Sequence, residues 1–341
     1  MSAPTSANRP LTPERIGQLA WSYAPPLIIA AAVQHKLFDA IDAGGPQTAA
    51  EIARRANISV RGTRAIANAL ISIDLLAKDA QDRYSLTPES ATFLVTTKPS
   101  FQGGIFKHLD TQLVSKWLKL TEIVRTGKPA QSVNDQSTGA EFFQRFVEDI
   151  FPMSYGAAQA LADHLKLSSS TSPTKVLDLA AGSGVWGIAL AQKSPHVRVT
   201  AVDWPAVIPV TKRVAQRHNV ADRFTYVEGD LHSADFGAGH NIATLGHILH
   251  SEGQERSREL LARTFKALAP GGTIAIAEFL ANDTRTGPPN ALIFAVNMLV
   301  NTDHGDTFSF SEISRWLSEA GFTNPRTLDA PGPSPLILAT K

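Results

Sequence analysis

The stretch VLDLAAGSGVWGI, residues 176–188, has the pattern of a buried strand, a glycine-rich turn and the start of a helix. Gly182 and Gly184 would allow the backbone to approach a ligand closely, where a side chain would collide. Together with Gly187 they satisfy G-x-G-x-x-G, and Asp203 follows Gly184 by 19 residues, so the spacing alone allows a dinucleotide site. A single match of this kind is a weak signal. The identity of the ligand is therefore inferred from the neighbouring acidic residues.

Three acids stand at the ends of three successive predicted strands, namely Asp178, Asp203 and Asp230. In a parallel sheet ligands bind beyond the carboxyl ends of the strands, so these side chains would line one site. Asp178 could balance a ligand ammonium group, Asp203 could accept from two ribose hydroxyls, and Asp230 could accept from an adenine amino group. A dinucleotide would gain nothing from an extra carboxylate near its pyrophosphate, so the set favours S-adenosylmethionine over NAD. Ordinary turn chemistry explains any one of the acids, but less readily all three.

The C-terminal half of the chain alternates short apolar runs with longer helical patterns. This alternation predicts an α/β fold, in which a Rossmann-like, doubly wound and mostly parallel sheet has helices on both faces. The predicted strands are 175–179, 197–202, 224–227, 241–245, 272–277 and 335–339.

Near the N-terminus, the pattern indicates a helix pair followed by a hairpin. Thr48-Ala-Ala-Glu51 has the spacing of a capping box that opens a helix at 49–55, and a second helix fits 59–76. Short strands at 75–77 and 84–86 flank a polar turn, which completes a winged-helix outline. A DNA-binding wing would carry an excess of basic residues. Basic and acidic residues nearly balance here, so a packing or dimerisation role is favoured: Arg61, Arg64, Lys78 and Arg83 stand against Asp74, Asp79 and Asp82.

Two breaks in composition, TTKPSFQGG at 96–104 and SSSTSPT at 168–174, divide the chain. We predict a winged-helix-like dimerisation domain at 1–104, a mostly helical connector that lines the substrate site at 105–170, and an S-adenosylmethionine-binding catalytic domain at 171–341.

The composition narrows the classes of function. The 341 residues include 32 basic and 31 acidic side chains, so the chain has no overall positive field to draw it to nucleic acid or an anionic membrane. The absence of cysteine excludes disulfides, cysteine nucleophiles and cysteine–zinc sites. The apolar runs near 25–33 and 291–300 are shorter than the ~18 residues of a membrane span, and no apolar leader precedes them. We therefore expect a cytoplasmic protein without a membrane or nucleic-acid partner.

A family resemblance rests on six stretches in a characteristic order and spacing. Residues 37–88 form the first, and the others are VLDLAAGSG, AVDWP, VEGDL, ILHSEG and LAPGGTIAIAE. With these, nearly the whole chain resembles the class I S-adenosylmethionine-dependent small-molecule O-methyltransferases of the caffeate and hydroxyindole type. The resemblance implies a homodimer whose N-terminal domains interlock, each helping to wall the partner's substrate site. It also implies S-adenosylmethionine as methyl donor, S-adenosylhomocysteine as product, and an aromatic small molecule as acceptor.

The resemblance also implies the residues that hold the cofactor. The loop Ala180–Gly184 would hold the methionine part, Asp203 the ribose, and Asp230 with Leu231 the adenine. In this chain Ala180 replaces the first glycine of the family's loop, and Gly246 stands where some members carry a lysine over the adenine. The expected cofactor-binding residues are Asp178, Ala180, Gly182, Gly184, Asp203, Trp204, Asp230, Leu231 and Gly246.

Methyl transfer to a phenol requires a base, and a histidine suits that role because its ordinary pKa of ~6.5 leaves it neutral near pH 7. His250 matches the family's catalytic histidine, and Glu278 matches the carboxylate that orients it. Two positions depart from the family pattern, because Ser251 replaces an Asp after the histidine and Thr307 replaces a second orienting Glu.

Acceptor-site residues are expected on aromatic-rich segments of the connector and on a later apolar helix. The predicted set is Trp117, Phe143, Phe146, Met153, Tyr155, Phe294, Asn297, Met298 and Thr302. Each aromatic residue taken alone is more readily explained as core.

Other chemistries fit less well. His247 and His250 could face one metal, but their possible third ligands, such as His232, His240 or Glu252, fall short of a zinc signature, so we expect no metal. No G-x-S-x-G elbow follows a strand, which argues against a serine hydrolase. The expectation is a homodimeric S-adenosylmethionine-dependent O-methyltransferase acting on a hydroxyl of an aromatic small molecule. The alternatives are a C-methyltransferase acting on an activated ring, or a regulator that binds adenosylmethionine without turnover.

Overall fold

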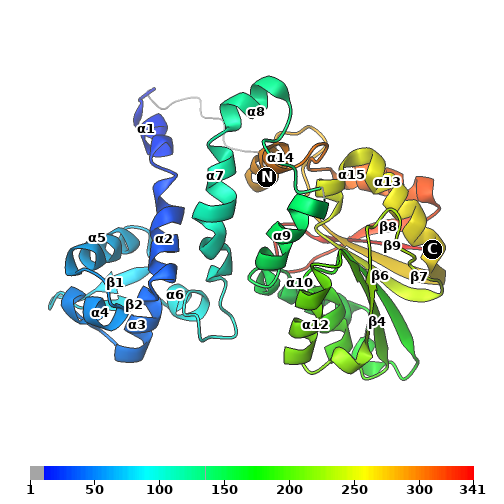
Figure 1. Cartoon of the computed structure of the whole chain (residues 1–341), viewed down its shortest axis with the longest axis horizontal. Coiled ribbons are helices and arrows are strands. Elements are labelled where there is room, and N and C mark those ends of the chain that lie inside the picture. The colour runs from blue at the N-terminus through cyan, green and yellow to red at the C-terminus, as the bar shows by residue number, and fades with distance from the viewer. Residues whose placement is uncertain (1–10, 135) are drawn as a thin grey trace. The chain divides into compact units, whose positions relative to one another are not determined.

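The computed structural model describes residues 11–134 and 136–341. The chain forms two compact units that divide between Asp110 and Thr111 (Figure 1). Each unit has its own hydrophobic core. The predicted connector at 105–170 falls mostly within the second unit. Its role as a separate part stays a prediction.

The first unit is mostly helical, with one small hairpin. The helices α4 and α5 pack on each other, and the strands β1 and β2 that follow them pair antiparallel, as the winged-helix outline predicts. The elements are α1 (Glu14–Ala20), α2 (Ala24–Gln34), α3 (Leu37–Gly44), α4 (Ala49–Ala56), α5 (Val60–Ile71), β1 (Leu76–Lys78), β2 (Tyr84–Leu86), α6 (Pro88–Phe93) and the 3-10 helix η1 (Gly103–His108).

Local sequence explains where α4 and α5 begin and end. The predicted capping box opens α4, because the Thr48 side chain accepts from the Glu51 backbone N–H and the Glu51 carboxylate accepts from the Thr48 backbone N–H at 2.8 Å. The helix α5 ends at Ile71, earlier than predicted, because Asp74 adopts a left-handed backbone with φ 58° that turns the chain into the hairpin.

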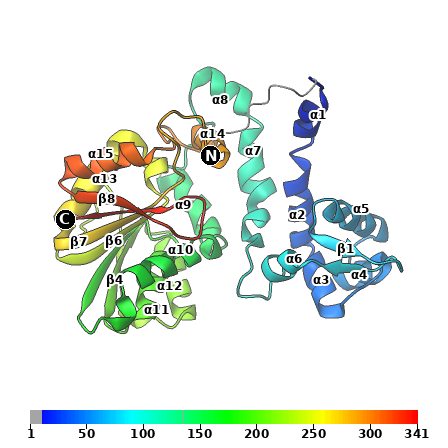
Figure 2. The ribbon, with the colours of Figure 1, turned by 180° about the vertical axis from the view of Figure 1, so that it is seen from behind.

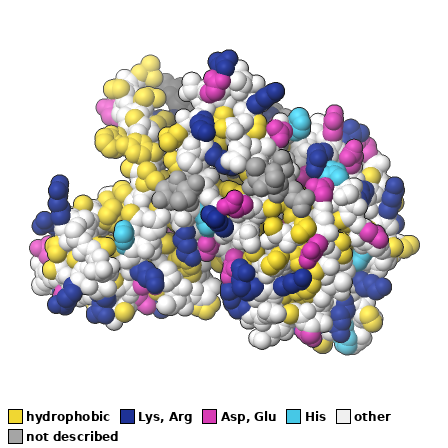
Figure 3. All heavy atoms as spheres, viewed as in Figure 1, with side chains coloured by type: hydrophobic (Ala, Val, Ile, Leu, Met, Phe, Trp, Pro, Cys, Tyr) yellow, Lys and Arg dark blue, Asp and Glu magenta, His cyan; other side chains and the backbone are white. Residues whose placement is uncertain are grey.

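Large apolar side chains on α1 and on its flanks are exposed. Figure 3 shows hydrophobic side chains gathered over this part of the first unit. The exposed residues are Leu11, Ile16, Leu19, Trp21 and Tyr23. The stretch Glu14–Gln34 is, by length and composition, the one helical segment of the described chain that could cross a membrane. The predicted apolar runs near 25–33 and 291–300 are each shorter than a span, and the longer stretch arises because α2 follows α1 almost directly.

The second unit is built on a seven-stranded sheet with the order β5-β4-β3-β6-β7-β9-β8. Neighbouring strands from β5 to β7 run parallel, while β9 runs antiparallel to both of its neighbours. This arrangement confirms the predicted Rossmann-like sheet. The strands are β3 (Thr174–Leu179), β4 (Val197–Asp203), β5 (Phe224–Glu228), β6 (His240–Gly246), β7 (Leu268–Ala277), β8 (Thr323–Leu328) and β9 (Leu336–Thr340).

Helices cover both faces of this sheet (Figures 1 and 2). One core cluster joins a face of the sheet to α10, α11 and α12, and a second joins the other face to α13 and α15. The helices after the division are α7 (Val114–Trp117), α8 (Leu120–Thr126), α9 (Gln136–Phe146), α10 (Phe151–His164), α11 (Val185–Lys193), α12 (Ile208–Arg217), α13 (Leu249–Ala267), α14 (Pro289–Asn301) and α15 (Phe310–Ala320), with short turns η2 (Leu109–Leu113), η3 (Leu167–Ser169) and η4 (Ala221–Arg223).

The strand β8 has no counterpart among the predicted strands. Its sequence TNPRTL is polar and contains Pro325, whose missing N–H argues against a central strand. The structure places β8 at the edge of the sheet, next to β9 only, where a proline and exposed polar side chains are tolerated.

Ala180 follows β3 with a left-handed backbone of φ 51°. A residue with a Cβ pays about 1–2 kcal/mol in this conformation, and glycine does not. On folding, glycine loses more backbone conformational entropy than alanine, which costs about 0.5–1 kcal/mol of folding free energy. Ala180→Gly should therefore raise the free energy of unfolding by up to about 1 kcal/mol in urea titrations.

The matched control is Ala160→Gly in the middle of α10, which should lower the free energy of unfolding by about 1 kcal/mol. An equal loss in both variants would contradict the strain assigned to residue 180.

Candidate active site

The glycine-rich loop is held at the carboxyl end of the sheet by hydrogen bonds to its backbone. The Asp203 carboxylate accepts from the Gly182 N–H at 2.7 Å, and the Thr211 hydroxyl donates to the Gly182 carbonyl at 2.7 Å. Gly182 and Gly184 both have positive φ, and Gly184 caps α11. The loop therefore presents its backbone beside Asp203 at the N-terminus of a helix.

Asp178 is fully buried beneath this loop. One carboxylate oxygen accepts from the Thr244 hydroxyl at 2.7 Å, and the other accepts from the Gly187 N–H at 3.0 Å. Burial, with a smaller contribution from the charge of the neighbouring Asp203, raises the pKa of Asp178 to about 7 against these two hydrogen bonds. Its described contacts are with the protein, so the predicted cofactor contact of its side chain stays a prediction.

Asp203 and Asp230 are linked at the ends of β4 and β5. Asp203 also accepts from the Trp204 N–H at 2.7 Å, and the Trp204 indole donates to Asp230 at 3.4 Å. Burial raises the pKa of Asp203 to about 6, opposed by its two backbone hydrogen bonds. Leu231 follows Asp230 and is buried. The structure thus brings four of the predicted cofactor residues together.

Gly246 ends β6 where the indole of Trp186 crosses it. A Cβ at this position would lie 1.9 Å from Trp186 Nε1, so only glycine fits while the indole stays in place. The space that a lysine side chain would need is occupied by Trp186, which α11 supplies.

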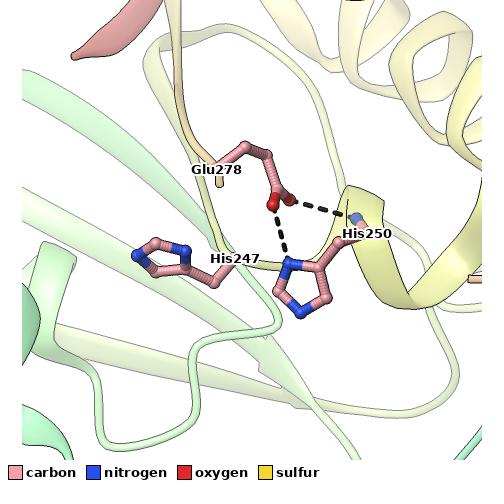
Figure 4. Close-up of side chains that lie close together, drawn as sticks. All are labelled: His247, His250 and Glu278. Carbon is pink, nitrogen blue, oxygen red and sulfur yellow. Dashed lines mark hydrogen bonds and ion pairs between the residues drawn. The ribbon is translucent and has the colours of Figure 1, made fainter. Parts of the chain in front are cut away.

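His250 and Glu278 meet as predicted (Figure 4). His250 lies near the start of α13, and Glu278 directly follows β7, the strand next to β6. The distance from His250 Nδ1 to Glu278 Oε2 is 2.6 Å, and the His250 backbone N–H donates to Glu278 Oε1 at 3.2 Å. Burial alone would raise the pKa of Glu278, but the charge and hydrogen bonds of His250 outweigh it and hold the pKa below its ordinary value. The carboxylate therefore stays ionised and fixes the imidazole.

His247 lies beside this pair with a left-handed backbone of φ 60°. Burial lowers the pKa of His247 to about 4, although Glu278 opposes the shift. Its Nδ1 atom is buried without a hydrogen-bond partner among the described residues. His247 is thus a neutral imidazole near neutral pH.

Two phenylalanines pack against these histidines. Phe279 and Phe294 stack with ring centroids 4.0 Å apart, and Phe294 meets the His250 ring edge-on at 4.9 Å. Phe279 also lies 5.3 Å from the His247 ring. Phe294 belongs to the predicted acceptor set, but Phe279 does not, and its place directly after Glu278 was the one signal available for it in the sequence.

The helix α14 joins this group to part of the predicted acceptor set. The Trp117 indole donates to the Asn297 side-chain oxygen at 3.1 Å, one turn along α14 from Phe294. Met298 is buried on the same helix, and the Thr302 hydroxyl donates to the Met298 carbonyl at 2.6 Å. The Thr302 hydroxyl also accepts from the Gly305 N–H, so it is engaged by the protein.

Other predicted acceptor residues lie elsewhere. Tyr155 donates to Gln192 at 2.6 Å and packs near His218, at the ends of α11 and α12 that point away from the glycine loop. These contacts do not bring Tyr155 to the Phe294 group, and its acceptor role stays a prediction. Phe143 packs 6.1 Å from Trp204, on the cofactor side. Phe146 packs near Phe142, and Met153 is 46% exposed. The roles of all the expected acceptor-site residues stay predictions.

The two positions that depart from the family pattern make other contacts around His250. Ser251 accepts from the Asn134 side chain through its carbonyl at 2.9 Å and its hydroxyl at 3.1 Å. The Asp306 N–H donates to the His250 carbonyl at 3.0 Å, and the buried hydroxyl of Thr307 has no partner among the described residues. The segment that contains Thr307 thus passes His250 without supplying a second carboxylate at that position.

Comparison with protein families assigns the chain. Residues 117–323 match the family model of the O-methyltransferase domain, and residues 18–96 match that of the O-methyltransferase dimerisation domain. The chain belongs to the O-methyltransferase family.

Relatives extend the likeness to nearly the full length of this O-methyltransferase. The tetracenomycin polyketide synthesis 8-O-methyl transferase TcmO of Streptomyces glaucescens is 30% identical over 333 residues, covering 96% of this chain and 97% of that protein. The 3-hydroxy-5-methyl-1-naphthoate 3-O-methyltransferase of Streptomyces sahachiroi is 30% identical over 319 residues, covering 92% and 91%. A structure of PigF with S-adenosylhomocysteine, from a Serratia strain, has 25% identity and a TM-score of 0.81, covering 97% of this chain and 100% of that one.

The chain is thus an S-adenosylmethionine-dependent methyltransferase. Its loop fits such a ligand, because Gly182 and Gly184 leave the backbone bare beside the Asp203 carboxylate. That carboxylate makes two backbone hydrogen bonds and keeps further lone pairs with which to accept from a ligand.

Binding of S-adenosylhomocysteine should strengthen as pH rises from 5 to about 7.5. The raised pKa values of Asp178 and Asp203 mean that both carboxyls are largely protonated at the lower pH. Only the ionised forms accept hydrogen bonds with both oxygens, so affinity should increase by about tenfold and then level off. Calorimetric titration across this range measures the effect.

The same shifts should make the ligand-free protein lose stability as pH rises from about 4 to 7, since the folded state there binds more protons than the unfolded state. Asp203→Asn serves as the control and should flatten part of the affinity profile. An affinity that is independent of pH in the unchanged protein would contradict the assignment.

Proposed function

We propose that this O-methyltransferase methylates a hydroxyl group of an aromatic small molecule, with His250 as general base and Glu278 as the residue that positions it. The observation that carries the proposal is the 2.6 Å contact between His250 Nδ1 and Glu278 Oε2. This contact lies at the carboxyl ends of the parallel strands β6 and β7, and the glycine loop follows the carboxyl end of the neighbouring strand β3. Both the ring and the backbone N–H of His250 are bound to this one buried carboxylate.

The hydrogen bond defines which nitrogen acts. An ionised Glu278 accepts from Nδ1–H, so the lone pair of the neutral imidazole is on Nε2, which points away from Glu278 in Figure 4. Nε2 takes the proton of the acceptor hydroxyl as the oxygen attacks, and Glu278 stabilises the imidazolium that forms. The imidazolium then returns the proton to solvent. When bound, S-adenosylmethionine supplies the electrophilic methyl group.

For the cofactor, we propose that the Ala180–Gly184 loop holds the methionine part and that Asp203 accepts from the ribose hydroxyls. Asp230, Leu231 and Trp204 would hold the adenine, with Gly246 beside them. Asp178 would act through the loop, since its carboxylate binds the Gly187 N–H at the start of α11. The linked hydrogen bonds of Asp203, Trp204 and Asp230 support this assignment.

For the acceptor, we propose a site formed by Phe294, Phe279 and Trp117 together with Asn297. The stacked phenylalanines meet the His250 ring, and α14 carries both Phe294 and Asn297. An aromatic ring packs well on such a surface, since aromatic pairs gain about 0.5–1.5 kcal/mol beyond the area they bury. The naphthoate O-methyltransferase named above acts on an aromatic acceptor, which agrees with this proposal.

His250→Ala should lower kcat by about 10²–10⁴-fold, because the proton then has no base to accept it. Glu278→Gln should lower kcat by about 10–100-fold through loss of the charge that holds the imidazole. The measurement is methyl transfer from labelled S-adenosylmethionine to a panel of phenols and naphthols, with S-adenosylhomocysteine affinity as the readout of an intact cofactor site.

His240→Ala is the matched control, because His240 is also buried but lies at the opposite end of β6. It should retain turnover. Unchanged turnover in His250→Ala would remove the base role, and a product methylated on a ring carbon would leave His250 as a positioning group.

We also propose a homodimer formed through the first unit. The apolar side chains on α1 and its flanks are exposed in a single chain, and they fall largely within the segment that matches the dimerisation domain. A second copy of the chain would cover them, which accounts for the apolar length of Glu14–Gln34 without a membrane.

Trp21→Asp should weaken the dimer by about 2 kcal/mol or more, roughly 30-fold, because a charge replaces a large exposed aromatic at the proposed interface. Light scattering after size exclusion should give twice the 36.6 kDa chain mass for the unchanged protein and a lower mass for the variant. Val60→Asp, exposed at the start of α5, is the control and should stay dimeric. A monomer before any substitution would overturn the proposal.

A further inference from the structure

We propose that His247, His250 and Glu278 form a binding site for a divalent transition-metal ion such as Zn²⁺, and that the bound ion blocks methyl transfer. The ion in this proposal is an inhibitor and not a cofactor. The binding part stands on the side-chain cluster itself, whereas the inhibition rests on the proposed function of His250.

The three side chains converge on one point. Each offers one ligand atom, and these atoms all lie within 4.8 Å of one another. Figure 4 shows the two imidazole rings flanking the Glu278 carboxylate. Zinc bonds to imidazole nitrogen and carboxylate oxygen are about 2.0–2.2 Å long, so the side chains would rotate to bring all three atoms to bonding distance of one ion.

The ligands stand on well-fixed backbone. His247 directly follows β6, His250 lies near the start of α13, and Glu278 directly follows β7. The strands β6 and β7 are hydrogen-bonded neighbours, and the His247 N–H donates to the Ala277 carbonyl at 2.8 Å. Two histidines and one carboxylate form a ligand set that suits zinc, cobalt and ferrous ions.

The buried Nδ1 atom of His247 points independently to a missing partner. It has no hydrogen bond among the described residues, although it lies next to an ionised carboxylate. Leaving a buried polar atom unpaired costs about 1–3 kcal/mol, so binding an ion there relieves an existing penalty.

A second cluster of histidine and carboxylate shows what this site lacks. His232 contacts Glu252 at 2.7 Å and Glu259 at 3.5 Å, but Arg256 also binds Glu252 at 2.7 Å. The guanidinium there supplies the positive charge that a metal would bring. Glu278, by contrast, has no Lys or Arg partner among the described ion pairs.

Metal binding would change which ring nitrogen of His250 carries the proton. An ion on Nδ1 needs the lone pair of that nitrogen, so the proton that Nδ1 donates to Glu278 moves to Nε2. No proton is lost and no bond other than N–H and metal–ligand bonds changes. Nε2 then carries a hydrogen and cannot accept the acceptor's proton, which is why the ion should inhibit.

The test is titration of metal-stripped protein with Co²⁺, followed by its visible absorption and by competition with Zn²⁺. One Co²⁺ per chain should bind with the absorption of a low-coordinate nitrogen–oxygen site, and Zn²⁺ should displace it. His247→Asn should weaken Co²⁺ binding by more than about tenfold. Asparagine suits this position because it tolerates the left-handed backbone.

His232→Asn is the matched control and should bind Co²⁺ as the unchanged protein does. Retained S-adenosylhomocysteine affinity shows that each variant is folded, and Glu278→Gln provides a second variant that should lose Co²⁺. Zn²⁺ should also inhibit methyl transfer, and the turnover of His247→Asn should resist it by the same factor of about ten or more.

Co²⁺ binding that is absent, equal in His247→Asn, or lost in His232→Asn would overturn the site. The two proposals fail separately. If His250→Ala keeps full turnover, while Co²⁺ binds the unchanged protein and binds His247→Asn more weakly, the base role falls and the metal site stands. If Co²⁺ does not bind while His250→Ala loses turnover, the metal site alone falls.

Discussion

The buried carboxylate of Asp178 joins three elements at the centre of the second unit. It is part of β3, it accepts from Thr244 on β6, and it accepts from the Gly187 N–H in the first turn of α11. The glycine loop between β3 and α11 is therefore fixed at both ends by one side chain. Gly187 has no room for a Cβ, which would lie 2.7 Å from Val199 and 3.0 Å from Asp178. The two hydrogen bonds of Asp178 thus hold the glycine loop, the sheet and α11 in position relative to one another.

Much of this arrangement follows from the sequence, because the signals for it are local. Alternating apolar runs indicate the parallel strands, glycines mark the loop, and a Thr-x-x-Glu spacing marks the start of α4. The pairing of His250 with Glu278 was expected from a resemblance, since residues 28 positions apart carry no local sign of contact. The structure places them together because β6 and β7 are neighbours in the sheet.

Other features lie beyond what sequence patterns can indicate. The edge strand β8 is polar and contains a proline, so it has neither the apolar run nor the alternation of a half-buried strand. Tyr155 was a candidate and Phe279 was not, yet packing places Phe279 against Phe294, whereas Tyr155 binds Gln192. The departures at Ser251 and Thr307 were visible in the sequence, but their present contacts were not.

The close approach of Trp186 to Gly246 has a consequence for how this chain can vary. The indole of one residue fills the volume that a side chain at the other would take. The side chains at positions 186 and 246 therefore compete for the same volume, although the two residues lie on different elements. A larger residue at 246 therefore requires either a smaller residue at 186 or a displaced indole. The same volume at the end of β6 can thus be filled either from the helix α11 or from the strand itself.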